Sequence, residues 1–232
     1  MPDLSELADL YAYPDKPLPW VRTNFVASVD GAVQDSRGVS GDLGGAPDLA
    51  VFRVLRSLAD VVIVGAGTAR AEGYKPIQAD AVHEALRTGR QRVPLLAVVT
   101  RSLEIPEDLL APGTMVITTV TSPAEARERL AQMVDVVVAG DDEIDWAAVL
   151  DSFAARGLHR ILCEGGPELH GALVERDLVD EVCVTIGPHL VGGPMKRITE
   201  GSSPVERPMR LGHVFEQDDV LLTRWVRDRR SS

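Results

Sequence analysis

Short apolar runs that alternate with helical segments constrain the fold of this chain more than any other feature of its sequence. Runs such as 61–64 and 95–99 are too short for buried helices and end in turn residues, which is typical of strands buried on both faces of a parallel sheet. The final strands follow one another without a helix. We therefore expect an α/β fold, with helices on both faces of a mainly parallel mixed sheet and an antiparallel edge near the C-terminus. Strands are predicted at 21–28, 61–64, 95–99, 116–120, 134–139, 161–163, 180–186 and 220–226.

The predicted helices have recognisable ends. Ser122-Pro123-Ala124-Glu125 is typical of a capping box with proline at the first helical position, so a helix should cover 123–133. Another helix at 145–156 should end at Gly157. Residues 73–92 are polar and irregular and are expected to be solvated surface. Helices are also predicted at 167–176 and at 47–59, the latter with Leu49, Phe52, Leu55 and Leu58 on its buried face.

The first 20 residues differ from the rest of the chain. Prolines at positions 2, 14, 17 and 19 predict a short helix followed by an extended arm. No later segment resembles a linker, a repeat or a low-complexity tract. We expect an N-terminal arm at 1–20 and a single domain at 21–232, a length that one α/β core can accommodate.

Charge and composition argue against several functions. The chain carries 24 basic and 35 acidic residues, a net charge of −11, which disfavours nucleic acid or an anionic membrane surface as the main partner. No apolar run approaches the roughly 20 residues that cross a bilayer, and the acidic N-terminus lacks the features of a secretory signal. Cys163 and Cys183 both lie in predicted strands, as expected for core thiols in a reducing compartment, so a cytoplasmic location is expected.

The junction at 161–169 is the strongest indication of a ligand site. An apolar strand leads through Gly165 and Gly166 to Pro167, where a helix begins. Glycines let a ligand approach the backbone, and a helix N-terminus binds anions. Glu164 should lie at the carboxyl end of the strand, where open α/β sheets bind ligands. A simple tight turn is the alternative.

Two further strand ends carry groups that suit phosphate. Gly65-Ala66-Gly67-Thr68 follows one predicted strand, and Thr100-Arg101-Ser102 follows the next. Together with the junction at 161–169 they suit an extended ligand with a diphosphate and a separate phosphate, such as NADPH. The planar guanidinium of Arg101 could bind the adenosine 2′-phosphate, although a solvated strand end is the alternative.

Other site types lack their residues. The five histidines form no H-E-x-x-H pair and neither cysteine belongs to a C-x-x-C pair, so no zinc site is predicted. Neither a G-x-S-x-G elbow nor a Walker phosphate loop occurs. Arg70 stands where the dinucleotide fingerprint after Gly65 requires its third glycine, which argues against a standard dinucleotide fold.

Four segments resemble the reductase half of the bifunctional riboflavin-biosynthesis deaminase-reductase, in the dihydrofolate-reductase-like superfamily. They are Asn24-Phe25-Val26-Ala27-Ser28-Val29-Asp30-Gly31, Arg56 with 59–68, Glu164-Gly165-Gly166-Pro167, and Leu178-Val179-Asp180-Glu181. The resemblance implies a three-layer fold, NADPH as hydride donor and a homodimer. It also implies a substrate, 5-amino-6-(5-phosphoribosylamino)uracil, that accepts hydride at C1′. The zinc motifs of the deaminase half are missing, which implies a stand-alone reductase.

The resemblance also implies roles for individual residues. The backbone of Ala27 would meet the nicotinamide carboxamide, and Thr100, Arg101 and Ser102 would hold the adenosine end. Ser40 and Arg56 would bind near the ribose phosphate of the substrate, and Glu164 would face the substrate. The residues expected around the diphosphate and its ribose are Gly65, Thr68, Gly165, Gly166, Pro167, Glu168 and Leu169.

Two departures from the family pattern concern catalysis. Asn24 stands where the family has a substrate-facing lysine, and Glu72 stands where it has an aspartate. An amide cannot fill the electrostatic role of an ammonium. A pterin or dihydrofolate substrate therefore stays open, as does a non-catalytic NADPH-binding regulatory protein. Either Glu164 or Glu72 could stabilise a cationic imine or relay a proton to it.

Overall fold

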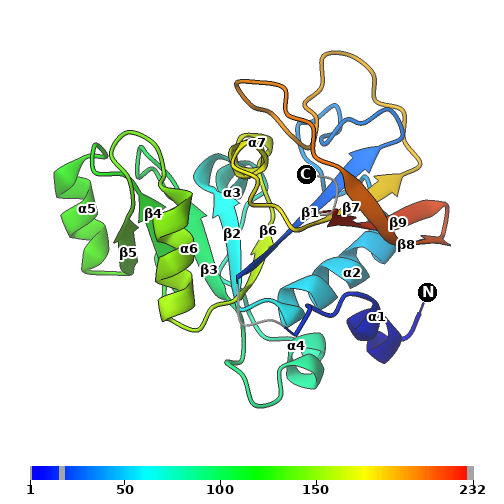
Figure 1. The fold of residues 1–232 in the computed structure, drawn as a ribbon, viewed down its shortest axis with the longest axis horizontal. Coiled ribbons are helices and arrows are strands. Elements are labelled where there is room, and N and C mark those ends of the chain that lie inside the picture. The colour runs from blue at the N-terminus through cyan, green and yellow to red at the C-terminus, as the bar shows by residue number, and fades with distance from the viewer. Residues whose placement is uncertain (1, 16–18, 229–232) are drawn as a thin grey trace.

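A computed structural model describes residues 2–15 and 19–228, which build one nine-stranded sheet (Figure 1). The strand order is β5-β4-β3-β2-β6-β1-β7-β9-β8. Neighbouring strands from β5 to β7 are parallel, whereas β9 is antiparallel to both β7 and β8. The predicted parallel sheet with an antiparallel C-terminal edge is therefore confirmed. The strands span Trp20–Ser28 (β1), Val61–Gly65 (β2), Leu95–Val99 (β3), Thr114–Thr118 (β4), Asp135–Val138 (β5), Arg160–Cys163 (β6), Glu181–Gly187 (β7), Met209–Gln217 (β8) and Val220–Arg227 (β9).

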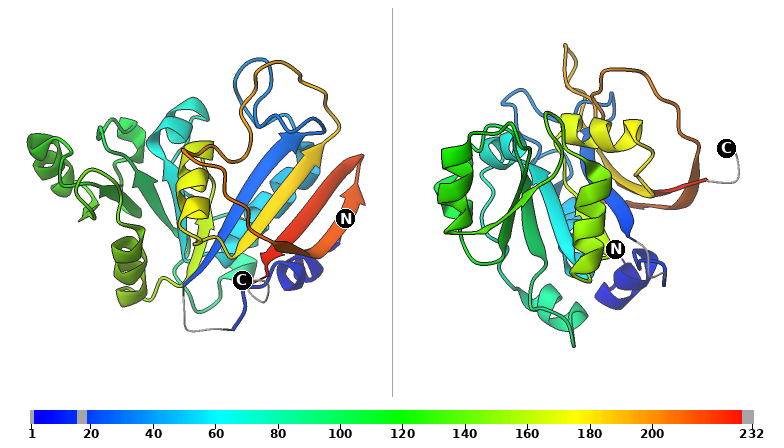
Figure 2. Two further views of the ribbon diagram at one scale, coloured as in Figure 1. Left: turned by 45° about the horizontal axis from the view of Figure 1, so that its top comes forward. Right: turned by 60° about the vertical axis from the view of Figure 1, so that its left-hand side comes forward.

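Helices cover both faces of the sheet and confirm the three-layer arrangement (Figure 2). On one face α1 to α4 pack against inward side chains such as Val62 and Leu162. On the other face α6 and α7 pack against Ile63 and Ile161. The helices span Leu4–Leu10 (α1), Gly45–Leu58 (α2), Ala66–Ala71 (α3), Ala81–Leu86 (α4), Ala124–Ala131 (α5), Trp146–Ala155 (α6) and Pro167–Glu175 (α7), with a 3₁₀ turn at Glu107–Leu109.

The N-terminal arm contains the predicted short helix, and buried charges join the arm to the sheet. The guanidinium of Arg22 donates from Nη2 to the carbonyl oxygen of Tyr11 at 2.7 Å and from Nε to Glu181 at 2.6 Å. Arg224 donates from Nε to the same carboxylate oxygen at 2.8 Å. Position 17 of the predicted arm and positions 229–232 of the predicted domain lie outside the described residues. Within residues 2–15 and 19–228, the helices lack the combination of length and hydropathy that crossing a membrane requires.

Two elements were not predicted. The polar segment 73–92 contains α4, whose first amides, those of Val82 and His83, donate to the side chain of Asp80 at 3.0 Å. Strand β8 was missed because a register shift between Leu211 and His213 breaks its alternation. Both elements depend on a local cap or bulge that hydrophobic periodicity does not record.

Two details of the helix predictions were wrong. The capping box before α5 does not form: Pro123 is the N-cap without a side-chain hydrogen bond, and the hydroxyl of Ser122 donates to the carbonyl of Thr119 at 2.7 Å. In α2 the fully buried residues are Val51, Val54, Leu55, Pro47 and Ser57. Of the predicted buried face only Leu55 is fully buried, and Leu49 is 48% exposed.

The chain opens a crevice between β2 and β6, which are neighbours in the sheet. Strand β2 leads into α3, whose Ala66 and Ala69 pack on one face, whereas β6 leads into α7, whose Leu169 and Leu173 pack on the other. Because the two connections leave toward opposite faces, the carboxyl ends of these strands form a topological switch point, the usual ligand site of open α/β sheets.

Candidate active site

Glycines bring the two strand ends at the switch point into contact. The amide of Gly65 donates to the carbonyl of Gly165 at 2.7 Å. Gly165 has φ +89°, and a Cβ there would lie 2.9 Å from the ring of Phe25. A Cβ on Gly166 would overlap Oγ1 of Thr68. The peptide bond between the two glycines is cis. Glycine avoids a side-chain contact at both positions, and at Gly165 it also suits the backbone conformation.

A cleft of about 1150 Å³ opens at this junction, larger than the usual pocket of about 300–1000 Å³ for a small ligand. Its walls are the turn after β2, the end of β3, the N-terminus of α7 and part of the loop that follows β7. Three strand ends singled out by the sequence thus meet in one cleft. The predicted site residues that line it are Gly65, Thr68, Glu72, Thr100, Arg101, Ser102, Gly166, Pro167, Glu168 and Leu169.

Cationic side chains that were not predicted also line this cleft. Arg70, Arg176 and Lys196 all contribute to its walls. The ammonium of Lys196 lies 3.0 Å from the carboxylate of Glu200 and 4.0 Å from that of Glu168. Arg70 lies two residues after the Gly-x-Gly-Thr turn, a signal that could have been used. Lys196 lies in a long loop, and its sequence neighbours give no indication of its position.

The residues expected at the adenosine end lie side by side after β3. The hydroxyl of Thr100 is occupied, because it accepts the amide hydrogen of Leu103 at 3.0 Å. Ser102 accepts the amide hydrogen of Glu104 at 3.4 Å. Arg101 is exposed in the cleft. Thr100 and Ser102 therefore shape the turn, and the guanidinium of Arg101 is the group best placed to bind an anion.

Glu164 and Arg56 form a buried ion pair at the carboxyl end of β6. Arg56 donates from Nε and Nη2 to the two carboxylate oxygens, both at 2.7 Å, and the hydroxyl of Tyr74 donates to Oε2 at 2.8 Å. The Glu164 side chain is 2% exposed and that of Arg56 is 17% exposed. Burial alone lowers the pKa of Arg56, but the charge and hydrogen bonds of Glu164 outweigh burial and raise it.

Glu72 has a different environment from Glu164. Its Oε1 accepts the backbone amide hydrogen of Ser40 at 3.1 Å, so it joins the turn after α3 to the loop between β1 and α2. This contact brings two predicted site residues together, through the backbone of Ser40 and not its hydroxyl. Glu72 is half-buried and lines the cleft.

The remaining predicted residues lie beside the cleft and not in its wall. Asn24 and Ala27 are buried on β1, in register with Cys183 and Ile186 of β7. The predicted site residues outside the cleft wall are Asn24, Ala27, Ser40, Arg56, Glu164 and Gly165. Tyr74, which joins Glu164 to the segment after α3, was not predicted. It is the only aromatic residue in the polar stretch 73–92, and that was the available signal.

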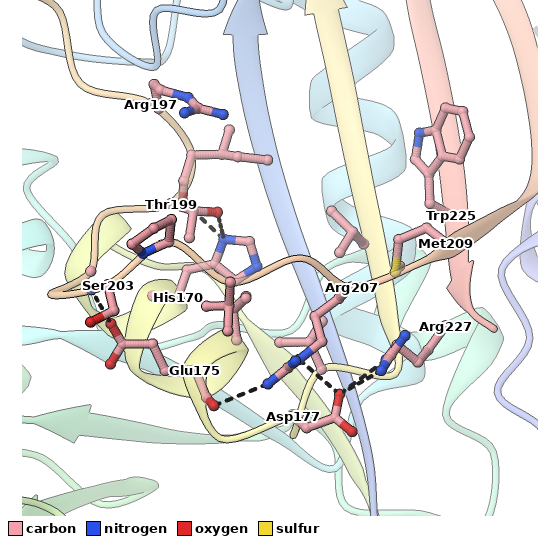
Figure 3. Close-up of a pocket in the computed structure, with 18 of the residues that line it drawn as sticks. His170, Glu175, Asp177, Arg197, Thr199, Ser203, Arg207, Met209, Trp225 and Arg227 are labelled. Atoms are coloured by element: carbon pink, nitrogen blue, oxygen red, sulfur yellow. Dashed lines mark hydrogen bonds and ion pairs between the residues drawn. The ribbon is translucent and has the colours of Figure 1, made fainter. Parts of the chain in front are cut away.

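A second cavity of about 620 Å³ lies between α7, β7, β9 and the loop after β7 (Figure 3). It contains His170 and three arginines, two of which, Arg207 and Arg227, pair with Asp177. None of the predicted site residues, all of which are described, lines this cavity. The described residues also contain no group of three His, Cys, Asp or Glu side chains that could hold a metal ion.

Comparison with known families agrees with this geometry. The family model for the RibD C-terminal domain matches residues 19–222. The chain belongs to this family. The match covers β1 to β8 and the start of β9, so the cleft and the Glu164 cluster lie within it.

Over the aligned residues, the curated relatives are a little more than a quarter identical to the chain. A protein of Archaeoglobus fulgidus named 2,5-diamino-6-ribosylamino-4(3H)-pyrimidinone 5′-phosphate reductase is 26% identical over 209 residues, which are 85% of this chain and 95% of that protein. A protein of the same name from Aquifex aeolicus is 27% identical, covering 89% of this chain and 96% of the relative. The riboflavin biosynthesis protein RibD of Chlamydia trachomatis is 29% identical over 92% of the chain, which spans only 56% of that longer protein.

Solved structures show the same fold. A pyrimidine reductase-like protein from Corynebacterium diphtheriae superposes with a TM-score of 0.84 at 25% identity and covers 96% of this chain and 98% of that one. The yeast riboflavin biosynthesis reductase Rib7 has a TM-score of 0.69 at 16% identity and covers 98% and 100% of the two chains. The predicted resemblance to the riboflavin-biosynthesis reductases is therefore confirmed.

Proposed function

We propose that this protein is an NADPH-dependent reductase that transfers hydride to C1′ of a phosphorylated ribosylamino-pyrimidine in riboflavin biosynthesis. The observation that carries the proposal is the glycine-lined cleft at the carboxyl edge of the sheet, beside a buried carboxylate. Membership of the RibD C-terminal domain family and the names of the curated relatives support the reaction type.

The residues of the cleft fit a reduced nicotinamide dinucleotide. Gly65, Gly67 and Gly166 line the cleft, and a Cβ on Gly67 would meet nothing within 4 Å, so the backbone there is open to a ligand. The N-terminus of α7, nine residues long, favours the negative charge of a diphosphate. Gly165, Pro167, Glu168 and Leu169 would complete this cradle. Arg101 would bind the 2′-phosphate of the adenosine, with Thr100 and Ser102 shaping its turn, and the backbone of Ala27 would meet the nicotinamide.

The residues of the chain then have to orient the acceptor carbon and stabilise charge on it. The bound nicotinamide would supply the hydride. Glu164 would place its negative charge near the C=N group of the opened ribose and favour its protonated form, whose positive charge the transferred hydride then neutralises. Arg56 would hold Glu164 and contact the ribose phosphate region through Nη1, which takes no part in the ion pair. Glu72 would hold the Ser40 loop against the substrate, and Asn24 would offer a neutral amide where the family resemblance implies a lysine.

Binding and turnover assays test this proposal. Purified protein is titrated with NADPH by fluorescence, and NADPH oxidation is then followed with 2,5-diamino-6-ribosylamino-4(3H)-pyrimidinone 5′-phosphate, 5-amino-6-(5-phosphoribosylamino)uracil and dihydrofolate. We expect NADPH binding and oxidation with one of the two ribosylamino-pyrimidines. Oxidation with dihydrofolate alone would assign the protein as a pterin reductase. Binding without turnover would indicate a regulatory protein, and failure to bind NADPH would refute the proposal.

We also propose that the protein works as a homodimer in the cytoplasm. One row of apolar side chains crosses β8, β9 and β7 at Leu211, Trp225 and Val182. Leu211 is 44% exposed and Trp225 is 36% exposed. A second copy would cover this apolar row, which continues into the cavity of Figure 3. The two cysteines are buried free thiols, which suits a reducing compartment. Light scattering at micromolar concentration tests the dimer, and a monomeric mass would refute it.

A further inference from the structure

We propose that Tyr74 is a positioning residue for Glu164, which it holds in the orientation that the reaction needs. The inference rests on the proposed function, since it assigns a role within the same site. The family resemblance did not point to Tyr74. The role of Tyr74 is inferred from the hydrogen bonds around the Glu164 carboxylate.

Glu164 accepts hydrogen bonds from three donors on two separate segments. Arg56 of α2 supplies two N–H groups, and Tyr74, three residues after α3, supplies one O–H group. A bidentate guanidinium fixes the plane of a carboxylate. The third donor approaches Oε2 from another part of the chain. Removing the Tyr74 hydroxyl would therefore leave the ion pair intact but free the carboxylate to turn with Arg56.

The two aromatic rings beside Arg56 restrain the guanidinium as well. The guanidinium carbon lies 4.1 Å from the ring centre of Phe52, one turn earlier on α2, and 5.4 Å from that of Tyr74. The ring and the hydroxyl of Tyr74 thus act on both members of the ion pair. Phe52 contacts only Arg56 in this cluster, so the hydroxyl of Tyr74 is the feature that acts on Glu164 directly.

The chemical state of the donors determines what Glu164 can do. Burial, followed by the negative charge of Glu164, raises the pKa of Tyr74 well above its ordinary value, so its hydroxyl stays protonated and donates at any working pH. Arg56 keeps its charge. The carboxylate of Glu164 is therefore the acceptor in all three of these hydrogen bonds. These donors fix the positions of both carboxylate oxygens of Glu164.

The position of this cluster distinguishes it from the other buried ion network of the chain. Glu181 is held by Arg22 and Arg224 at the start of β7, the amino end of the strand, where it ties the N-terminal arm to the sheet. Glu164 lies one residue after β6, at the carboxyl end, beside the glycine junction. Parallel α/β sheets bind ligands at carboxyl ends. Of these two networks, the Glu164 cluster is therefore the one placed to act on a ligand.

A double-mutant cycle on the full-length protein tests the inference. The variants are Tyr74→Phe, Glu164→Gln and the double variant, assayed for kcat and KM with NADPH and the ribosylamino-pyrimidine that the wild type reduces. Tyr74→Phe should lower kcat by about 10-fold, because it removes a hydrogen bond to a charged group, with less than about a 2-fold change in the Kd for NADPH. Once Glu164 is Gln, adding Tyr74→Phe should change kcat by less than about 2-fold.

Tyr13→Phe is the matched control. Its hydroxyl donates to the carbonyl of Ile161 at 3.2 Å, at the other end of β6, so it loses one hydrogen bond far from Glu164. Its kcat should equal that of the wild type. If Glu164→Gln does not fold, Glu164→Asp replaces it, because the shorter side chain withdraws the carboxylate from Tyr74 while keeping the charge.

The outcomes separate the inference from the proposed function. Two results would overturn the role of Tyr74 and leave the proposed reaction standing. One is an additive loss of kcat in the double variant, and the other is an equal kcat for Tyr74→Phe and Tyr13→Phe in an active enzyme. A wild-type protein that reduces neither ribosylamino-pyrimidine would overturn both. A non-additive cycle with unchanged NADPH affinity supports Tyr74 as a positioning residue.

Discussion

Oγ1 of Thr68 occupies the space that a side chain on Gly166 would need. The two residues lie on opposite sides of the switch point. Thr68 belongs to α3, and Gly166 is the residue before α7. Their contact explains in steric terms why the junction between β6 and α7 carries a second glycine.

We predict that Gly166→Ala weakens NADPH binding by about 10-fold or more, because Thr68 or the N-terminus of α7 must shift to admit the methyl group, typically at a cost of 1–3 kcal/mol. The Kd from fluorescence titration measures the effect. Gly41→Ala is the control, since a Cβ there meets nothing within 4 Å and its φ is not positive. Unchanged affinity in Gly166→Ala would show that this turn does not carry the diphosphate.

Cofactor preference depends on Arg101 in the proposed arrangement. Arg101→Ala should raise the Kd for NADPH by about 10-fold, the loss of one charge-assisted contact to phosphate, and leave the Kd for NADH within about 2-fold. Arg129→Ala, which removes an exposed arginine of α5 outside the cleft, serves as the control. Equal losses for the two cofactors in Arg101→Ala would contradict a 2′-phosphate site at this residue.

The stability of the protein should depend on His170 in acid. Burial lowers its pKa from 6.5 to about 4, and its ring lies 4.7 Å from that of Phe25, with Nδ1 2.9 Å from the carbonyl of Ile198. Between these two pH values the unfolded chain binds more protons than the folded one. Stability therefore falls as the pH decreases through this window, by about 3 kcal/mol in total.

Urea unfolding at pH 7 and pH 5 measures this dependence. His170→Gln should lose the His170 contribution and show a flatter profile than the wild type, whereas His189→Gln, at an exposed position, should keep the wild-type slope. Identical slopes for the wild type and His170→Gln would mean that another group causes the acid sensitivity.

Sequence reasoning predicted the sheet well because its signal is physical and local. Strands such as β2 and β3 are buried on both faces and read as continuous apolar runs, and Pro167 begins α7 as expected. It failed where one contact decides the structure, as at the bulge in β8 and the Asp80 cap of α4.

In the candidate site, too, sequence reasoning found the features with a local signal and missed those that depend on contacts between distant residues. The turns after β2, β3 and β6 were identified because glycines and hydroxyl residues mark them in the sequence. The partners of Glu164 were not, because Arg56 and Tyr74 are 108 and 90 residues away along the chain. The ion pair follows from the topology of the sheet, which places α2 and the segment after α3 against the end of β6, and no local pattern records it.

The structure also separates the two carboxylates that the sequence left as alternatives. Glu164 accepts three side-chain hydrogen bonds and is almost fully buried, whereas Glu72 accepts the backbone amide of Ser40 at the edge of the cleft. Glu164→Gln should therefore lower kcat by about 100-fold with little change in NADPH affinity, because it removes the charge that favours the protonated imine. Glu72→Gln keeps an oxygen that can accept the Ser40 amide hydrogen, so its kcat should stay within about 3-fold of the wild type.

Glu72→Ala removes that acceptor and should raise the KM for the substrate by about 10-fold, with kcat nearly unchanged, because the Ser40 loop then has to be ordered by the substrate. Steady-state kinetics of the three variants distinguish the two roles. A large fall in kcat for Glu72→Gln with full activity in Glu164→Gln would reverse the assignment and make Glu72 the residue that stabilises the imine. The present geometry favours Glu164, because a group held by three donors needs no reorganisation when the imine of the substrate is protonated.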